Sequence, residues 1–268
     1  MSLTDMLKPT QPLPNSPVAQ IATETAAVTR LLEAEGILDY SGHVSTRIPG
    51  RDAFVIQIGS TSRAEVEPGS MLVCDYDGNV LEGDGAPPSE LPIHTEIFKA
   101  RPDVQSVLHS HMELAIAFTM MEGVKLLPMR ARASRWKSGI PMDGDPSHIK
   151  LKSQGQALAK TLGPHHAVLM RAHGLCIVAE SVRALLIDAV HFKENATALM
   201  QTLQAGAKPI PLTDAEIAQI EKMEMRDWHI KKLWNYYTRK ATKEGVLPRE
   251  WDMVPTKEFM KRTKFLND

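Results

Sequence analysis

Residues 104–111 read VQSVLHSH, an apolar, strand-like stretch that ends on two histidines. Residues two apart on a strand point to the same face, so the imidazoles of His109 and His111 can converge on one ion. A His-x-His pair is equally typical of an ordinary surface pair or a hydrogen-bonded one. The stretch therefore predicts a strand and leaves open whether its histidines bind a metal.

A third histidine favours the metal. His173 lies in a polar turn, residues 171–174, between apolar runs at 167–170 and 175–178 that predict core strands. An imidazole buried at such a turn costs free energy unless a partner satisfies it. A metal ion would be one such partner, and a backbone carbonyl would be another.

Glu90 adds a carboxylate at the expected start of a helix, where the helix dipole favours an acidic side chain. Near a divalent ion it could be a ligand, a general acid or base, or both; the alternative is a solvated helix start. His94, one turn later, is expected to support the site or to pack beside it. Three histidines and a glutamate indicate the open site of a catalytic metal, because structural zinc sites are closed by four protein ligands.

Hydrophobic periodicity predicts one α/β domain with mixed or antiparallel strands. A flexible arm at 1–15 precedes a catalytic domain at 16–207, and a helical C-terminal extension at 208–268 packs on the domain or on a neighbouring subunit. The expected helices are 16–36, 89–100, 112–121, 149–162, 181–203 and 213–243. The expected strands are 44–48, 54–58, 71–74, 80–81, 104–111, 167–170 and 175–178.

The charge balance restricts the classes of partner. The 268 residues include 31 Lys and Arg against 32 Asp and Glu, a formal net charge of −1, which argues against general attraction to nucleic acid or an anionic membrane. No apolar run approaches the roughly 20 residues that cross a bilayer. Cys74 and Cys176 are isolated in apolar runs and predict no disulfide. We therefore expect a cytoplasmic protein without nucleic-acid or membrane partners.

Four motifs together resemble the class II aldolase/adducin family of metal-dependent lyases, over residues 20–205. The motifs are Ser41-Gly42-His43-Val44-Ser45-Thr46-Arg47, Pro88-Ser89-Glu90, His109-Ser110-His111 and Ala172-His173-Gly174. The resemblance implies a three-layer αβα fold around a central, largely antiparallel sheet, and a homotetramer with active sites at subunit interfaces. It also implies that His109, His111 and His173 bind one divalent metal ion per subunit and that Glu90 acts as acid or base. These ligands favour zinc, while manganese, iron and cobalt also suit them chemically.

The phosphate-binding motifs of the family's sugar-phosphate aldolases are altered in this sequence. Those enzymes use a Gly-Asn-x-Ser turn, a Thr-Gly-type loop and a Ser-Ser-Glu stretch. Here the Asn position is His43, the loop at 59–63 reads GSTSR, and Pro88 precedes Ser89. The changes argue against a phosphorylated substrate. The residues expected to bind substrate suit a carboxylate, which arginine can bind bidentately; they are His43, Ser60, Ser62, Arg63 and Ser89.

The predicted function is a metal-dependent carbon–carbon lyase acting on a small molecule, with a decarboxylase of a hydroxylated aromatic or pyridine (di)carboxylate favoured. The metal would stabilise the electron-rich intermediate left when CO₂ departs, and Glu90 or a nearby histidine would protonate the ring carbon. The C-terminal region around residues 234–237 resembles the decarboxylase members. It makes Tyr237 a candidate catalytic residue, with packing as the alternative.

Two other functions fit the same motifs. The first is an aldolase, epimerase or dehydratase acting on a small hydroxy-carbonyl compound or sugar. The second is a non-catalytic, adducin-like interaction domain. The adducin-like branch typically lacks the full ligand set, which this sequence keeps, so we favour an enzyme.

Overall fold

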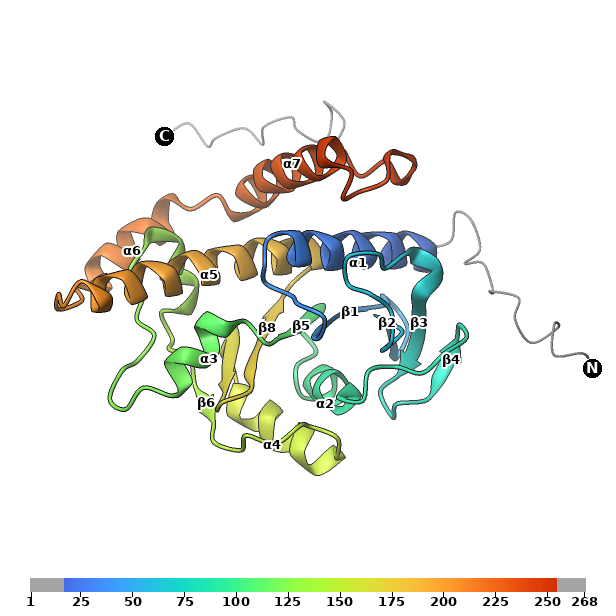
Figure 1. Ribbon diagram of the computed structural model, residues 1–268, viewed down its shortest axis with the longest axis horizontal. Coiled ribbons are helices and arrows are strands. Elements are labelled where there is room, and N and C mark those ends of the chain that lie inside the picture. The colour runs from blue at the N-terminus through green and yellow to red at the C-terminus, as the bar shows by residue number, and fades with distance from the viewer. Residues whose placement is uncertain (1–16, 255–268) are drawn as a thin grey trace, which may run out of the picture.

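An eight-stranded sheet forms the middle layer of the computed structural model, which describes residues 17–254 (Figure 1). The strand order is β4-β3-β2-β1-β5-β8-β7-β6, and every neighbouring pair is antiparallel except β6 and β7. The central, largely antiparallel sheet expected from the sequence is confirmed. The strands are β1 (His43–Arg47), β2 (Ala53–Gln57), β3 (Met71–Asp75), β4 (Val80–Glu82), β5 (Ser106–Ser110), β6 (Met142–Asp143), β7 (Ala167–Met170) and β8 (Gly174–Ala179).

Helices cover both faces of the sheet and complete the three layers. One face packs against α1 and α5, and the other against α2 and α4, while α7 lies across the outer side of α1 and α5 (Figure 1). The helices are α1 (Pro17–Ala34), α2 (Leu91–Ala100), α3 (Glu113–Thr119), α4 (Lys152–Leu162), α5 (Val182–Gln204), α6 (Asp214–Met223) and α7 (Arg226–Glu244). Within residues 17–254, none of these helices combines the length and the apolar character needed to cross a membrane.

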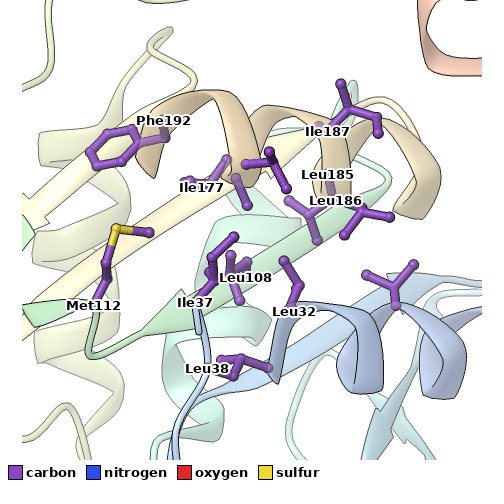
Figure 2. Packing of buried hydrophobic residues seen from close by; sticks show 14 of the residues in the cluster. Leu32, Ile37, Leu38, Leu108, Met112, Ile177, Leu185, Leu186, Ile187 and Phe192 are labelled. Carbon is purple, nitrogen blue, oxygen red and sulfur yellow. The ribbon is translucent and has the colours of Figure 1, made fainter. Parts of the chain in front are cut away.

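Alternating side chains of β8 belong to two different hydrophobic cores. On β8, Leu175 and Ile177 join the core beneath α1 and α5, whereas Cys176 and Val178 join the core beneath α2 and α4. Figure 2 shows part of the first core, in which Ile177 lies near leucines of α5. Each fully buried Leu or Ile stabilises the fold by about 1.5–3 kcal/mol. The same period of two places His109 of β5 on the face covered by α2 and α4.

The C-terminal extension differs from the sequence-based expectation. Residues 213–243 form two helices, α6 and α7, with Glu224 extended between them, so the prediction of one long helix was wrong. Ion pairs far apart in sequence accompany the break: Glu224 pairs with Arg132, and Arg226 pairs with the buried Asp188 of α5. Local periodicity carries no information about such pairs.

The outer ends of the chain lie outside the described residues. They include the arm expected at 1–15 and the last part of the extension, residues 255–268. The boundary between a catalytic domain and an extension near residue 207 stays a prediction.

Candidate metal centre

Three histidines converge at one end of β5. His109 lies within β5, and His111 follows directly after the strand, with their ring centroids 4.9 Å apart. His173 lies in the turn between β7 and β8, and β8 pairs with β5. Its ring centroid is 5.1 Å from those of both His109 and His111. The strand and the turn expected from the sequence therefore bring the three imidazoles together.

Gly174 makes this convergence possible. A Cβ atom at Gly174 would lie 2.3 Å from the carbonyl oxygen of Ser110, a contact that side-chain-bearing residues cannot make. The turn is held further by Ala172, which adopts a left-handed φ of 52° and donates its N–H to Thr119 Oγ1 at 2.9 Å. The β7–β8 turn can therefore pack directly against the end of β5 and deliver His173.

Replacing Gly174 with alanine is expected to displace this turn and weaken both folding and metal binding. Overpacking of this kind costs about 1–3 kcal/mol, so the Tm should fall by roughly 2–12 °C. Gly69→Ala is a matched control, because a Cβ at Gly69 meets nothing within 4 Å. Thermal unfolding and zinc titration of both variants test the prediction, and equal behaviour of the two would contradict it.

Glu90 brings a carboxylate into the histidine cluster. It occupies the N-cap position of α2, but its side chain makes no capping hydrogen bond. Oε2 lies 3.4 Å from His109 Nε2, and Oε1 lies 3.4 Å from His173 Nε2. The backbone N–H of Ile149 donates to Oε1 at 2.9 Å, which fixes the carboxylate in place. Glu90 is therefore a buried member of the cluster and not a solvated helix start.

The four side chains fit a divalent cation. One ligand atom from each of Glu90, His109, His111 and His173 lies within 4.8 Å of the others. Neither ring nitrogen of His173 makes a hydrogen bond although both are buried, since the approach to Glu90 lacks hydrogen-bond geometry. Nε2 of His109 and Nε2 of His111 are 3.1 Å apart. A cation with imidazole and carboxylate ligands would satisfy these atoms together.

The pKa shifts of His111 and Glu90 also suit a cation. Burial, followed by the charges of His109 and His173, lowers the pKa of His111 to about 4. Burial raises the pKa of Glu90, but the close imidazoles of His109 and His173 and the hydrogen bond from the amide of Ile149 outweigh it, so the net pKa lies below its usual range. Neutral imidazole and ionised carboxylate are the forms that bind metal.

A cavity of about 320 Å³ opens beside Glu90. Four of the five residues expected to bind substrate line it: His43, Ser60, Arg63 and Ser89. Ser62 does not line this cavity and is exposed, so its part in substrate binding stays a prediction. Ser62 belongs to a short irregular loop in which neighbouring residues point to different sides, and no period fixes which side faces the cavity.

Arg63 organises the loop at 59–63. Its side chain is buried, and Nε and Nη1 donate to the backbone carbonyls of Gly42, Gly59 and Thr61. Among the described residues, none accepts a hydrogen bond from Nη2. Nη2 of Arg63 can therefore still donate hydrogen bonds to a bound anion.

His43 owes its position to strand register. It pairs with His109 across β1 and β5, and the two ring centroids are 5.1 Å apart. His43 Nδ1 lies 2.6 Å from His94 Nε2, and His94 Nδ1 lies 2.5 Å from Ser45 Oγ. Burial, then the charge of His94, lowers the pKa of His43 well below its ordinary value. His94, whose pKa burial lowers to about 3, supports the site as its helical position suggested.

Two residues at the site were not predicted from the sequence. His148 Nδ1 lies 3.6 Å from Glu90 Oε1, and the His148 ring centroid lies 5.1 Å from that of His173. The side chain is 66% exposed, so His148 stands at the rim of the cluster. It precedes α4 in an irregular segment with no local signal. Ser41 lines the cavity and could have been found, because it opens the first of the four motifs.

Tyr237 lies away from the cluster of its own chain. It sits on α7, outside the α1/α5 layer, whereas Glu90 and His109 lie on the opposite side of the sheet. Tyr237 lines a different cavity with Lys193 and Glu194, and burial raises its pKa to about 12. Within one subunit, Tyr237 is a packing residue, which is the alternative that the sequence left open. Its entry into a neighbouring subunit's site stays a prediction.

Comparison with known proteins identifies the family of the chain. The 3,4-dihydroxyphthalate decarboxylase of Arthrobacter keyseri is 28% identical over 208 residues, which cover 73% of this chain and 84% of that protein. The fold is similar to that of an aldolase II superfamily protein from Pseudomonas syringae, with a TM-score of 0.75 and 23% identity over 88% of this chain and 96% of that one. It is also similar to an L-fuculose 1-phosphate aldolase from Glaciozyma antarctica PI12, with a TM-score of 0.74 and 18% identity over 91% and 98% of the two chains. The family model described as Class II Aldolase and Adducin N-terminal domain matches residues 23–200, and the chain therefore belongs to the class II aldolase/adducin family.

Proposed function

We propose that the chain is a divalent-metal-dependent lyase that decarboxylates a hydroxylated aromatic or pyridine (di)carboxylate. One observation carries this function: Glu90 belongs both to the histidine cluster and to the lining of a cavity that holds Arg63. A cluster able to bind a metal ion and a group able to bind an anion thus lie next to each other at one cavity. The name of the Arthrobacter relative, 3,4-dihydroxyphthalate decarboxylase, supports this substrate class over a sugar phosphate.

The cavity suits the carboxylate end of such a substrate. Nη2 of Arg63 and the hydroxyls of Ser60 and Ser89 offer donors to carboxylate oxygens, and charge-assisted hydrogen bonds are the stronger ones. A carboxylate bound there would lie next to Glu90, with the substrate hydroxyl directed to the histidine cluster. The residue at the family's Asn position, His43, lines the same cavity.

Glu90 is proposed to move the proton. His109, His111 and His173 would hold a divalent cation, which would supply Lewis-acid stabilisation of the negative charge that develops as the carbon–carboxylate bond breaks. Glu90, ionised in the free protein, accepts the proton of the substrate hydroxyl. When the carbon–carboxylate bond breaks, CO₂ leaves and the electron pair stays on the ring carbon. Glu90 then returns the proton to that carbon, and solvent reprotonates the hydroxyl oxygen. Each turnover thus exchanges CO₂ for a proton without an external oxidant or reductant.

Three further properties are proposed on chemical grounds and on the family resemblance. Zinc is the metal that best suits three imidazoles and a carboxylate, with manganese, iron and cobalt as alternatives. The protein would assemble as a homotetramer, as the family resemblance implies. It would work in the cytoplasm, where its isolated, buried cysteines stay reduced.

The test is a substrate panel offered to the zinc-loaded protein. One arm holds ortho-hydroxy aromatic and pyridine dicarboxylates, 3,4-dihydroxyphthalate among them, and records CO₂ release. The other arm holds hydroxy-aldehyde and sugar-phosphate aldol substrates and records cleavage. We expect CO₂ from at least one dicarboxylate and no aldol cleavage. Aldol cleavage without CO₂ release would favour the aldolase. A protein that cannot be loaded with zinc and has no activity in either arm would favour the adducin-like domain.

A further inference from the structure

Ser45, His94 and His43 form a buried chain that leads to the substrate cavity. Ser45 Oγ lies 2.5 Å from His94 Nδ1, and His94 Nε2 lies 2.6 Å from His43 Nδ1. Ser45 and His94 are fully buried, and His43 is 3% exposed. The one remaining ring nitrogen, Nε2 of His43, belongs to a side chain that lines the cavity. A strand residue, a helix residue and a site residue are therefore connected in a single line.

The direction of the hydrogen bonds in this chain can be worked out from its buried end. A neutral imidazole has one donor and one acceptor nitrogen, so the chain has two arrangements. In the first, Ser45 donates to His94 Nδ1, His94 Nε2 donates to His43 Nδ1, and His43 presents an N–H at Nε2. In the second, every bond runs the other way, and His43 presents a lone pair.

Only the first arrangement satisfies the serine. Among the described residues, His94 is the one hydrogen-bond partner of Ser45 Oγ. In the second arrangement the serine hydroxyl proton would be buried with no acceptor. Leaving such a group unpaired disfavours the second arrangement by roughly 5- to 150-fold.

We infer that Ser45 and His94 are positioning residues that hold His43 in its Nε2–H tautomer, so that the cavity carries a fixed N–H donor for an anionic oxygen of the substrate. This inference rests on the proposed function only for the identity of that oxygen, a carboxylate. The tautomer itself follows from the hydrogen bonds. A fixed donor favours an anion and disfavours a ligand group that must itself donate.

The tautomer can be observed directly. Long-range ¹H–¹⁵N spectra of the zinc-loaded, ¹⁵N-histidine-labelled full chain distinguish Nδ1–H from Nε2–H, and His43→Asn identifies the signals that belong to His43. We expect Nε2–H at His43, with the other tautomer below about one sixth of the population. In Ser45→Ala, His94 Nδ1 loses its partner whether or not it carries the proton. We therefore expect His43 to populate a mixture of the Nδ1–H and Nε2–H tautomers. Ser45→Thr keeps the hydroxyl and should restore the wild-type spectrum.

Ser106→Ala is the matched control, because Ser106 is a buried serine on the neighbouring strand whose hydroxyl bonds Thr46 instead of a histidine. It should leave the His43 signals unchanged. Nδ1–H at His43 in the wild type would overturn the inference, as would an unchanged tautomer in a folded Ser45→Ala protein.

Ligand titration tests the second half of the inference. Phthalate, which carries carboxylates, should shift the His43 Nε2–H signal, whereas catechol, which carries only hydroxyls, should not. A fixed tautomer with no response to saturating phthalate would overturn the anion-donor role. The decarboxylase proposal is decided separately by CO₂ release, so the two can fail independently.

Discussion

Replacing His109 with alanine is expected to weaken divalent-metal binding by more than roughly 100-fold and to abolish measurable turnover. Loss of a residue that merely supports a ligand already costs about 10- to 100-fold in metal affinity, so loss of a ligand should cost more. His109 is fully buried between Glu90 and His111, at the centre of the cluster. The truncation costs folding about 2–4 kcal/mol, which a chain with two large cores should tolerate.

Zinc titration against a chromogenic chelator measures this effect, with circular dichroism to show that the variant is folded. His165→Ala is the control, because His165 bonds Ser138 and the carbonyl of Gly139 outside the cluster. It should bind zinc as the wild type does. A folded His109→Ala protein with zinc affinity within about threefold of wild type would contradict the assignment of this histidine as a ligand.

Glu90→Gln is expected to reduce kcat by about 10²- to 10⁴-fold while the metal still binds. Glutamine keeps the shape of the side chain, and its amide oxygen can still accept the hydrogen bond from Ile149. The three imidazoles remain, so zinc affinity should fall only modestly. What is lost is the ionised oxygen that accepts and returns a proton.

Glu96→Gln is the matched control for this variant. Glu96 lies on the same helix, is buried to the same extent as Glu90 and pairs with Lys99 away from the cluster. Its substitution should leave kcat unchanged. If Glu90→Gln kept kcat within about threefold of wild type, Glu90 would not be the proton-transfer group.

The parts of the site carried by local patterns could be predicted from the sequence. The strand that carries His109 and the two strands that flank His173 follow from apolar runs and from a polar turn, and these elements form as expected. The motif around Glu90 placed the carboxylate at the start of α2. The prediction of these elements needs only residues that are close together in the sequence.

The parts that depend on tertiary placement could not be predicted. His43 meets His109 because of β1–β5 register, and His148 reaches Glu90 from an irregular segment with no period. The split between α6 and α7 is accompanied by an ion pair between Arg226 and Asp188 of α5. The family resemblance made Tyr237 a candidate catalytic residue. Its position is determined by the packing of α7 on α1 and α5, which the sequence does not reveal. Sequence patterns say which residues share a face and not which faces meet.

The metal centre itself is tested most directly by diffraction. A crystal of the zinc-loaded protein, measured on both sides of the zinc absorption edge, should show one strong anomalous peak per subunit. We predict that this peak lies about 2.0–2.1 Å from a ring nitrogen of each of His109, His111 and His173. No peak at the cluster, or a peak bound elsewhere such as at His191 and His229, would contradict the account.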